Sequence, residues 1–359
     1  MSWETSLSTF VWIFPVGRGN AAFLRTALNH GIILDMGGGQ LVDPVAFIKT
    51  HFLKKLSAYP ERDGKKIAQA VLSHPHSDHI RQCDSLGAGD LYPTLLTCPN
   101  EKSEEEKLNW DRIENPKGDD DLTNSYKKLY ADRNPPLQTI LHESRRSVPN
   151  LEYGIYYVAP PTCDELHESA SANNEYGNCT SIMLYLRHGS HTILFPADMT
   201  PEGMKQILEE RRGIQKRFTR FESSTVPAEA SWHTTTGGQP SLKSLLRSYG
   251  LTILVAPHHG LESCYSTDLY DSIKGGKPNL VILSERRKRH ENDGNTDARY
   301  QSEQGAVGLD VEIDGKTERG RLSLSTKDGH HILIVFSGTG LPKVYADKNP
   351  DNLIKKLPG

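Results

Sequence analysis

The sequence predicts a mixed α/β protein in which a layered pair of β-sheets is flanked by helices. Short runs rich in β-branched and aromatic residues recur along the chain, and they twice give way to segments with apolar residues at helical spacing. A meander of short strands also opens each half, which argues against a purely parallel sheet. The 359 residues show no fixed-period repeat, and we expect one domain over residues 1–359.

Composition and charge exclude several classes of protein. Hydrophobic residues make up 36% and charged residues 24% of the chain, which is typical of a globular protein. The 42 Lys and Arg against 45 Asp and Glu give a formal net charge of -3, so no positive field over the whole surface attracts nucleic acid. The five cysteines are widely spaced without a CxxC motif, which argues against a disulfide framework or a thiolate zinc site.

The first 20 residues lack the cationic leader and continuous apolar stretch of a signal peptide. No apolar run of about 18 residues, the length that crosses a bilayer, occurs in the chain. We therefore expect a cytoplasmic protein that does not associate with membranes.

Strand and turn signals dominate the first 72 residues. Three apolar runs predict an antiparallel meander, broken by the Gly17-Arg18-Gly19-Asn20 turn. Helical spacing follows over Val42–Leu56. Ile67–Leu72 is a short apolar run that enters a polar loop, the pattern of a buried strand with functional residues at its end. The runs of the meander are 9–14, 21–25 and 31–35.

Residues 101–150 are highly charged and contain Pro135-Pro136, which predicts an insertion of solvated helices. Such a segment can lack chemistry altogether or provide a docking surface for a protein partner. Helices are expected again at about 202–211 and at 267–273. Strands are expected at 152–158, 180–187, 192–195, 251–256, 280–283, 321–325 and 332–336, the last two as a hairpin around Asp328-Gly329.

The strongest motif follows the strand that ends at Leu72. Three histidines and an aspartate lie within six positions, in the order HxHxDH. Neutral imidazoles with one carboxylate are the ligands that zinc and similar divalent ions prefer. The first two histidines, at i and i+2 in an extended loop, can face one ion, and the Asp-His pair can address a second. The residues are His74, His76, Asp78 and His79.

This motif resembles that of the metallo-β-lactamase superfamily, and the resemblance extends along the chain. Ile33–Gly37 is similar to the early LxDxG strand end, Ala197-Asp198 to the later Gly-Asp metal bridge, and Pro257-His258-His259-Gly260 to the final histidine. The superfamily implies a four-layer αββα sandwich. A GH-type histidine motif between HxHxDH and the bridging aspartate is absent, and Ala197 replaces the usual glycine.

The PHHG form of the final histidine motif is found in a narrower group of the superfamily than HxHxDH. With Val16–Ala21 and Asn178–Ser181, it is similar to the soluble domain of the competence protein ComEC and to related phosphorylcholine esterases, which also lack the GH motif. By this resemblance, two divalent ions, Zn or Mn, share Asp198 as a ligand. His74 and His76 complete the first site, and Asp78, His79 and His259 complete the second.

The resemblance places His258 at the mouth of the site, in contact with substrate, although the roles of His258 and His259 could be exchanged. Asp35 either orients a ligand histidine or simply ends its strand in a turn. The turn at Gly17–Asn20 could lend amides to a phosphate or be merely a hairpin. A loop with four consecutive cations follows Leu283 and either faces a polyanion or is simply solvated. Its predicted substrate-binding residues are Arg286, Arg287, Arg289 and Asn292.

Two divalent ions outweigh the charge of two carboxylates and a hydroxide, so the centre favours an anionic substrate. A hydroxide generated between two ions can attack a phosphodiester in line. We therefore expect a phosphodiesterase or nuclease, acting on DNA, RNA or another phosphodiester, with Asp78 and His258 as catalytic residues and His258 as the acid for the leaving group. Alternatives are an esterase of a small or lipid-linked phosphodiester, a thiolesterase, and a metal-stabilised binding or regulatory module of a multi-gene system such as antiviral defence.

Overall fold

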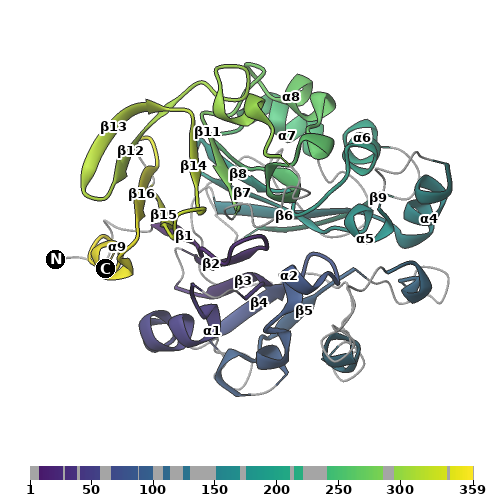
Figure 1. Ribbon diagram of the computed structural model, residues 1–359, viewed down its shortest axis with the longest axis horizontal. Helices are drawn as coiled ribbons and strands as arrows, with labels where there is room; N and C mark the ends of the chain where they lie inside the picture. Colours follow the sequence, from purple (N-terminus) through teal and green to yellow (C-terminus); the bar gives the residue numbers. More distant parts are fainter. Residues whose placement is uncertain are drawn as a thin grey trace.

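The structure is a computed structural model of the 359-residue chain. It describes residues 8–26, 29–38, 41–56, 66–87, 89–99, 108–113, 124–129, 151–169, 175–210, 214–220, 241–285, 295–337 and 340–358. In this part of the chain the strands form two sheets that lie face to face between helices (Figure 1).

The first sheet has nine strands within the described residues, and it contains the N-terminal meander. Its order is β13 (Lys316–Arg321), β12 (Leu309–Ile313), β16 (Lys343–Asp347), β15 (His331–Phe336), β1 (Thr9–Ile13), β2 (Ala21–Arg25), β3 (Gly31–Met36), β4 (Ile67–Val71) and β5 (Leu95–Thr97). Strands β1, β2 and β3 pair antiparallel, which confirms the predicted meander, and β3, β4 and β5 pair parallel.

The second sheet has seven strands in the described part of the chain. Its order is β14 (Ser323–Ser325), β11 (Leu280–Leu283), β10 (Ile253–Val255), β8 (His191–Phe195), β7 (Met183–His188), β6 (Leu151–Val158) and β9 (Ile214–Arg220). Strands β7 and β8 form the hairpin expected around residues 188–190, and β8, β10 and β11 run parallel.

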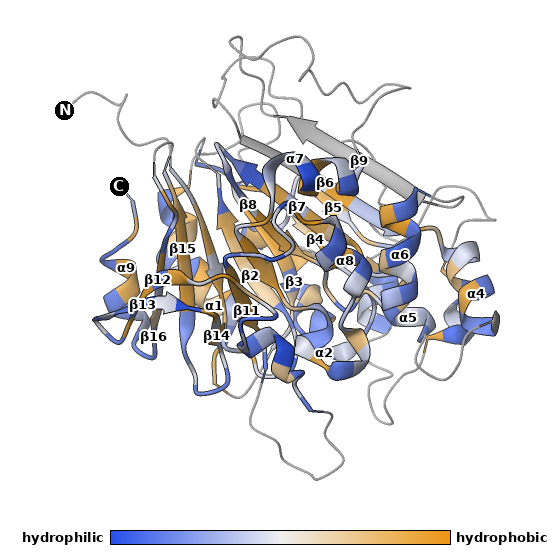
Figure 2. Ribbon diagram, turned by 90° about the horizontal axis from the view of Figure 1, so that it is seen from above, coloured by the Kyte–Doolittle hydropathy of each residue, from blue (hydrophilic) through white to orange (hydrophobic). Residues whose placement is uncertain are grey.

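Side chains alternate between two apolar layers along each central strand. Val11 and Ile13 of β1 belong to the core between the sheets, together with residues of the second sheet such as Ile193 and Val255. Phe10 and Trp12 point the other way, into a core beneath the first sheet. Both faces of the central strands are therefore buried, one between the sheets and one under the helices. Figure 2 shows the hydrophobic colouring of these strands.

Helices cover the outer face of each sheet. The second sheet is covered by α4 (Pro160–Ser169), α6 (Pro201–Glu209), α7 (Leu242–Tyr249) and α8 (Thr267–Ser272), whose apolar residues share one core with its strands. Beneath the first sheet lies the segment expected to be helical over 42–56. It begins as α1 (Pro44–Phe47) and continues as a π-helical turn at Ile48–Phe52 and a 3₁₀ turn at Leu53–Lys55. The predicted four-layer αββα arrangement is thus confirmed (Figure 1).

The remaining helices are short. They are α2 (Ser77–Ile80), α5 (Tyr176–Cys179) and α9 (Pro350–Ile354), with 3₁₀ turns at Cys83–Leu86, Gly89–Leu91, Trp110–Arg112, Pro257–Gly260, Glu262–Cys264 and Ala298–Gln301. Among the described residues no helix has the length and apolar character needed to cross a bilayer.

The predicted hairpin of 321–325 with 332–336 is wrong. Strand β14 pairs parallel with β11 in the second sheet, whereas β15 pairs antiparallel with β1 in the first. The turn at 328–329 therefore carries the chain from one sheet to the other. Alternation of apolar residues shows that each run is a strand but does not show which sheet it joins.

The charged segment 101–150 is described only at residues 108–113 and 124–129. Leu108 and Ile113 are buried in the core of the second sheet, and Tyr126 and Leu129 are buried beneath the first. Residues 124–129 are helical, as expected, with residues 124, 127 and 128 exposed and Tyr126 and Leu129 packed into the core. The rest of the segment lies outside the described residues, and its role as an insertion or docking surface stays a prediction.

Replacing Trp12 with alanine is expected to destabilise the protein strongly. Its side chain is 0% exposed, its ring lies 5.1 Å from that of Phe47, and its indole N–H donates to Nδ1 of His331 at 3.1 Å. Loss of these contacts should lower the free energy of unfolding by about 3–5 kcal/mol, measured by denaturant titration. The control Leu41→Ala, at a side chain 66% exposed, should change it by less than about 0.5 kcal/mol. Equal midpoints for the two variants would refute the packing described.

Candidate metal centre

The HxHxDH motif lies in the loop and short helix that follow β4. His74 is fully buried, His76 precedes the first residue of α2, and Asp78 and His79 lie in the first turn of that helix, as expected. The loop is fixed to the second sheet because the amide of Ile182 donates to the carbonyl of Ser73 at 2.9 Å. The motif is therefore held at the interface of the two sheets.

Asp35 holds the motif in place from the end of β3. Its carboxylate accepts hydrogen bonds from the Ser73 amide at 2.6 Å and the Ser73 hydroxyl at 2.8 Å. It also lies 2.8 Å from Nδ1 of His79, which directs Nε2 of that ring away from Asp35 and into the site. This geometry matches a carboxylate that orients a ligand histidine, the first of the two roles expected for Asp35.

Two tight loops of the second sheet bring the other residues. Asp198 follows β8, directly after Ala197, whose φ of 52° lies in the left-handed region. His258 and His259 follow β10 with φ values of 46° and 58°. The His258 amide donates to the Ala197 carbonyl at 2.9 Å, so the two loops support each other. Such backbone conformations are uncommon outside glycine and are frequent at functional sites.

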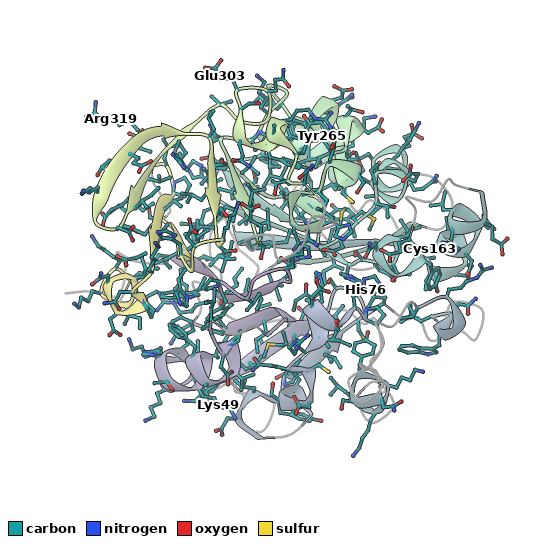
Figure 3. All side chains as sticks on the ribbon, in the orientation of Figure 1. Lys49, His76, Cys163, Tyr265, Glu303 and Arg319 are labelled. Carbon is teal, nitrogen blue, oxygen red and sulfur yellow. The ribbon has the colours of Figure 1, made fainter. Side chains whose placement is uncertain are left out.

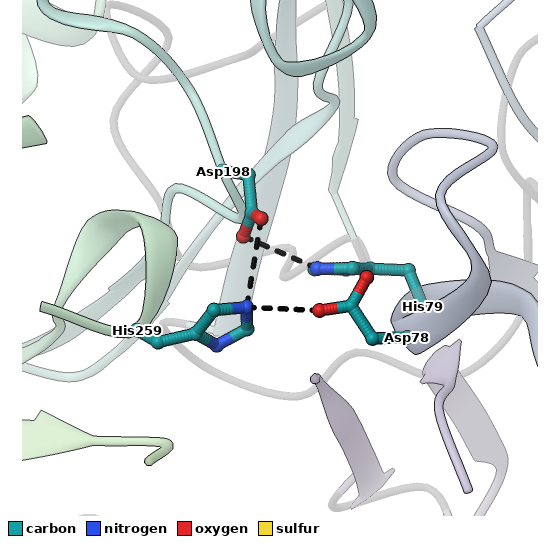
Figure 4. Close-up of side chains that lie close together, drawn as sticks. All are labelled: Asp78, His79, Asp198 and His259. Atoms are coloured by element: carbon teal, nitrogen blue, oxygen red, sulfur yellow. Dashed lines mark ion pairs between the residues drawn. The ribbon is translucent and has the colours of Figure 1, made fainter. Parts of the chain in front are cut away.

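Four predicted ligands from both sheets meet at one point (Figure 4). One ligand atom from each lies within 4.8 Å of the others. Nε2 of His79 lies 3.2 Å from a carboxylate oxygen of Asp198, and Nε2 of His259 lies 3.2 Å from Asp78 and 3.5 Å from Asp198. These four residues are the set expected for the second ion.

The donor atoms fit a divalent metal ion. Nε2 of His79, Nε2 of His259 and Oδ1 of Asp198 are buried, and apart from the close contacts within this cluster they have no hydrogen-bond partner among the described residues. Buried polar atoms are normally paired, and here the three have only the cluster, or an ion bound in it, to pair with. Two imidazoles and two carboxylates form a set that suits zinc, manganese or a similar ion.

The first-ion set lies beside this cluster. Nε2 of His74 is 3.0 Å from Nδ1 of His76 and 3.8 Å from a carboxylate oxygen of Asp198. Asp198 therefore lies between the two sets, as expected of a bridging ligand. Figure 3 labels His76 between the layer of α2 and that of α5. A Cβ at Gly177 of α5 would clash with Nε2 of His76, so glycine is needed there for the ring to keep its place.

The two adjacent histidines take different positions. The side chain of His259 is 3% exposed and contacts both Asp78 and Asp198. The side chain of His258 is 24% exposed, and its ring nitrogens lie 3.5 Å from Asp198 and 3.1 Å from the sulfur of Cys264. The geometry favours His259 as the ligand and His258 at the mouth. Arg286, Arg287, Arg289 and Asn292 lie outside the described residues, so their contact with substrate stays a prediction.

The pKa values show which groups hold protons without a metal. Burial disfavours charge on every member. For Asp78 and Asp198, the neighbouring imidazoles, above all His79, outweigh burial and hold both pKa values well below the usual range. For His79 and His259, the Asp198 carboxylate outweighs burial, raising the pKa of His79 well above normal and that of His259 to about 9. Burial and His79 lower the pKa of His74 well below its ordinary value.

Several residues in or beside the motifs support the site through contacts that the motifs do not reveal. Ser73 bonds Asp35, and Ser181 lies 3.3 Å from Nδ1 of His74. Gly19 and Gly37 pack so closely on Asp78 that a Cβ at either would clash with its carbonyl oxygen. The Gly17–Asn20 turn joins β1 to the antiparallel β2, which confirms the hairpin, and Gly19 in it packs against the HxHxDH helix; binding of a phosphate by this turn stays a prediction. Only contacts between residues far apart in the chain reveal these roles.

Comparisons with known proteins add little at this point. No family model matches the chain, and no curated protein matches it. Among 34 matching chains of solved structures is a Thermotoga maritima protein provisionally assigned as a metallo-β-lactamase. The match has a TM-score of 0.29 and 14% identity, and it covers 56% of this chain and 84% of that one. So low a TM-score carries no argument, and the site rests on its own geometry.

Metal affinity should fall as the pH is lowered. Because the pKa of His259 is about 9 and that of His79 is also raised, protons occupy both rings at neutral pH and a metal must displace them. Zinc affinity, measured by competition with a chromophoric chelator, should weaken by about tenfold per pH unit for each proton displaced below pH 9. Replacing the surface residue His330 with asparagine should leave the profile unchanged. A constant affinity between pH 6 and 9 would contradict these protonation states.

Gly37→Ala should weaken metal binding more than Gly38→Ala does. The added Cβ at Gly37 meets the backbone carbonyls of Asp78 and Asn20, whereas at Gly38 it meets the side chain of Arg81 at 3.1 Å, which can move. Displacing Asp78 should reduce zinc affinity by about 10- to 100-fold, as loss of ligand support does elsewhere. The neighbouring Gly38→Ala is the matched control and should stay within about twofold. Equal affinities in titrations of the two variants would show that this close approach does not position the ligand.

Proposed function

We propose that this chain is a metal-dependent phosphodiesterase of the metallo-β-lactamase type that acts on nucleic acid. The observation that carries the proposal is the convergence of the six predicted ligands from three separate segments, with Asp198 between the two sets. The HxHxDH order, the later aspartate and the final histidine each follow an expected strand. Family membership is part of the proposal and is supported by these residues rather than by overall similarity.

Divalent ions at this site would polarise a phosphoryl oxygen and acidify water, which is the chemistry that phosphodiester hydrolysis requires. The chain's own residues hold the geometry. Asp35 and Ser73 fix the His79 ring, and Asp198 serves both ligand sets. An anionic phosphodiester suits a centre whose cations exceed its carboxylates, and this favours phosphodiesters over neutral esters or thiolesters.

We assign His258 to substrate contact because its side chain is partly exposed and lies 3.5 Å from Asp198. Burial lowers its pKa, so its imidazole is largely neutral at pH 7. A neutral imidazole at the mouth can hydrogen-bond a phosphate or leaving oxygen, whereas only its small protonated fraction could donate as an acid. We therefore assign His258 to substrate contact first and to proton transfer second.

The decisive test is hydrolysis by purified protein loaded with Mn²⁺ or Zn²⁺. The substrates are single-stranded DNA, duplex DNA, RNA and bis(p-nitrophenyl) phosphate. Activity should disappear with a chelator and return with metal, and Asp198→Ala or His76→Ala should reduce it at least about 100-fold. Arg247→Ala, remote on α7, is the control. Full activity in Asp198→Ala, or no activity on any phosphodiester, would overturn the proposal, the latter in favour of a binding or regulatory module.

The same assay separates nucleic acid from a small phosphodiester as the substrate. Simultaneous replacement of Arg286, Arg287 and Arg289 by glutamate should abolish cleavage of DNA and RNA. The rate of hydrolysis of the small chromogenic diester should stay unchanged. If all substrates are cleaved as by the wild type, the loop does not recognise a polyanion, and an esterase of small or lipid-linked phosphodiesters becomes the better assignment.

A further inference from the structure

A cavity of about 500 Å³ opens beside His259. It lies on the side of the centre formed by the Gly17–Asn20 turn, the end of β11, the segment 295–301 and the turn after β14. Its volume is in the range of small-molecule sites. Apart from His259, none of its lining residues belongs to the expected metal ligands. A substituent on a phosphate bound at the metal centre could enter this cavity.

The cavity wall is polar. Of the described residues that line it, only Leu261 and Ala298 are apolar. The others offer amides, carboxylates or cations, among them Asn295 and Gln301. A lipid chain gains little from such a wall, because apolar groups need apolar surroundings to be buried favourably. A sugar or nucleobase carries several donors and acceptors that these side chains can meet.

The described wall carries three carboxylates and two cations: Glu262, Glu285 and Asp297, with Arg18 and Lys327. The carboxylate of Asp297 is already engaged by the guanidinium of Arg299, with contacts of 2.5 to 3.0 Å. Glu285 accepts hydrogen bonds from Thr296 at 2.5 Å and from Ser325 at 2.7 Å. In the part of the chain that the structure describes, no carboxylate pairs with the exposed ammonium of Lys327. Lys327 therefore offers a positive charge that no described carboxylate neutralises, on the same cavity wall as Arg18 and the predicted metal ligand His259.

Hydrogen bonds hold the cavity wall in a fixed position relative to His259. The Asp297 amide donates to the carbonyl of Gly260, the next residue after His259, at 2.8 Å. The Glu262 amide donates to the carbonyl of Asn295 at 3.2 Å, and Leu261 bridges to Thr296. Because the wall is hydrogen-bonded to the loop that carries the predicted metal ligand His259, little conformational entropy of the wall is lost when a substrate binds.

We propose that this cavity binds the nucleotide unit next to the scissile phosphodiester. Lys327 and Arg18 would hold its flanking phosphate, and the amides of Asn295 and Gln301 would hydrogen-bond its sugar or base. The inference rests on the proposed function, because it names the substrate class of the same centre. It assigns nucleotides rather than lipid-linked phosphodiesters as the group that the site admits.

The test compares KM and kcat of metal-loaded variants on a short oligonucleotide and on bis(p-nitrophenyl) phosphate. Lys327→Glu should raise KM for the oligonucleotide about tenfold and reduce the salt slope by about one unit. Gln301→Ala should raise KM about threefold. In both variants kcat, and every parameter for the small diester, should stay within about twofold. Wild-type KM for the oligonucleotide in both variants would overturn the inference.

Lys343→Glu is the matched control. Lys343 is exposed on β16, where it pairs with Val335, and β16 lies five strands away from β4, which carries the HxHxDH motif at its end. The substitution Lys343→Glu makes the same change in net charge as Lys327→Glu. Because Lys343 does not line the cavity, KM for the oligonucleotide should stay unchanged. An equal rise in KM for both variants would show that overall charge, not the cavity, is responsible.

A binding measurement separates this inference from the proposed function. Adenosine 5′-monophosphate and inorganic phosphate are each titrated into metal-loaded protein by calorimetry. The nucleotide should bind more tightly than phosphate to the wild type, and Lys327→Glu should remove most of that difference. This result would support the cavity even if no phosphodiester is hydrolysed. Equal affinities for the two ligands, or no binding of the nucleotide, would overturn it even if hydrolysis is observed.

Discussion

The carboxylate of Asp198 is the point on which the centre depends. It is almost completely buried, and within 4 Å it meets imidazoles of His74, His79 and His259. An ionised carboxylate in such a place is stable only because imidazoles or a metal compensate its charge. His74 and His79 follow a strand of the first sheet, and His259 follows a strand of the second. Asp198 therefore contacts imidazoles from both sheets.

The ligand set was predictable because each member has a local signal. The HxHxDH motif, Asp198 and His259 all come within a few residues after an apolar run, and the structure places each at the end of a buried strand. Because β4 belongs to the first sheet and β8 and β10 to the second, strand order alone does not bring the three segments together, and their convergence was expected from the resemblance of the motifs to the metallo-β-lactamase superfamily. The alternation of apolar residues and the helical spacing predicted a pair of sheets flanked by helices, and the resemblance of the motifs implied the four-layer order.

What the sequence did not predict depends on long-range contacts. Strand β13, which is exposed along its whole length, has the polar sequence KTERGR and exists because its backbone pairs with β12 at the sheet edge. The sheet change between β14 and β15 is likewise invisible to local periodicity. Gly177 belongs to none of the motifs, and its role appears only when the ring of His76 is found against it; for Gly37 the motif is visible, but its contact with the backbone of Asp78 is not.

The division of the donor atoms along the chain has a consequence for synthesis. The HxHxDH segment leaves the ribosome early, Asp198 more than a hundred residues later, and His259 later still. A nascent chain that ends before His259 has its first imidazoles exposed but no complete cradle for an ion. Full affinity for a metal ion would therefore be reached only after the second sheet has been synthesised and has packed on the first. A bound ion would then indicate a molecule whose two sheets have assembled.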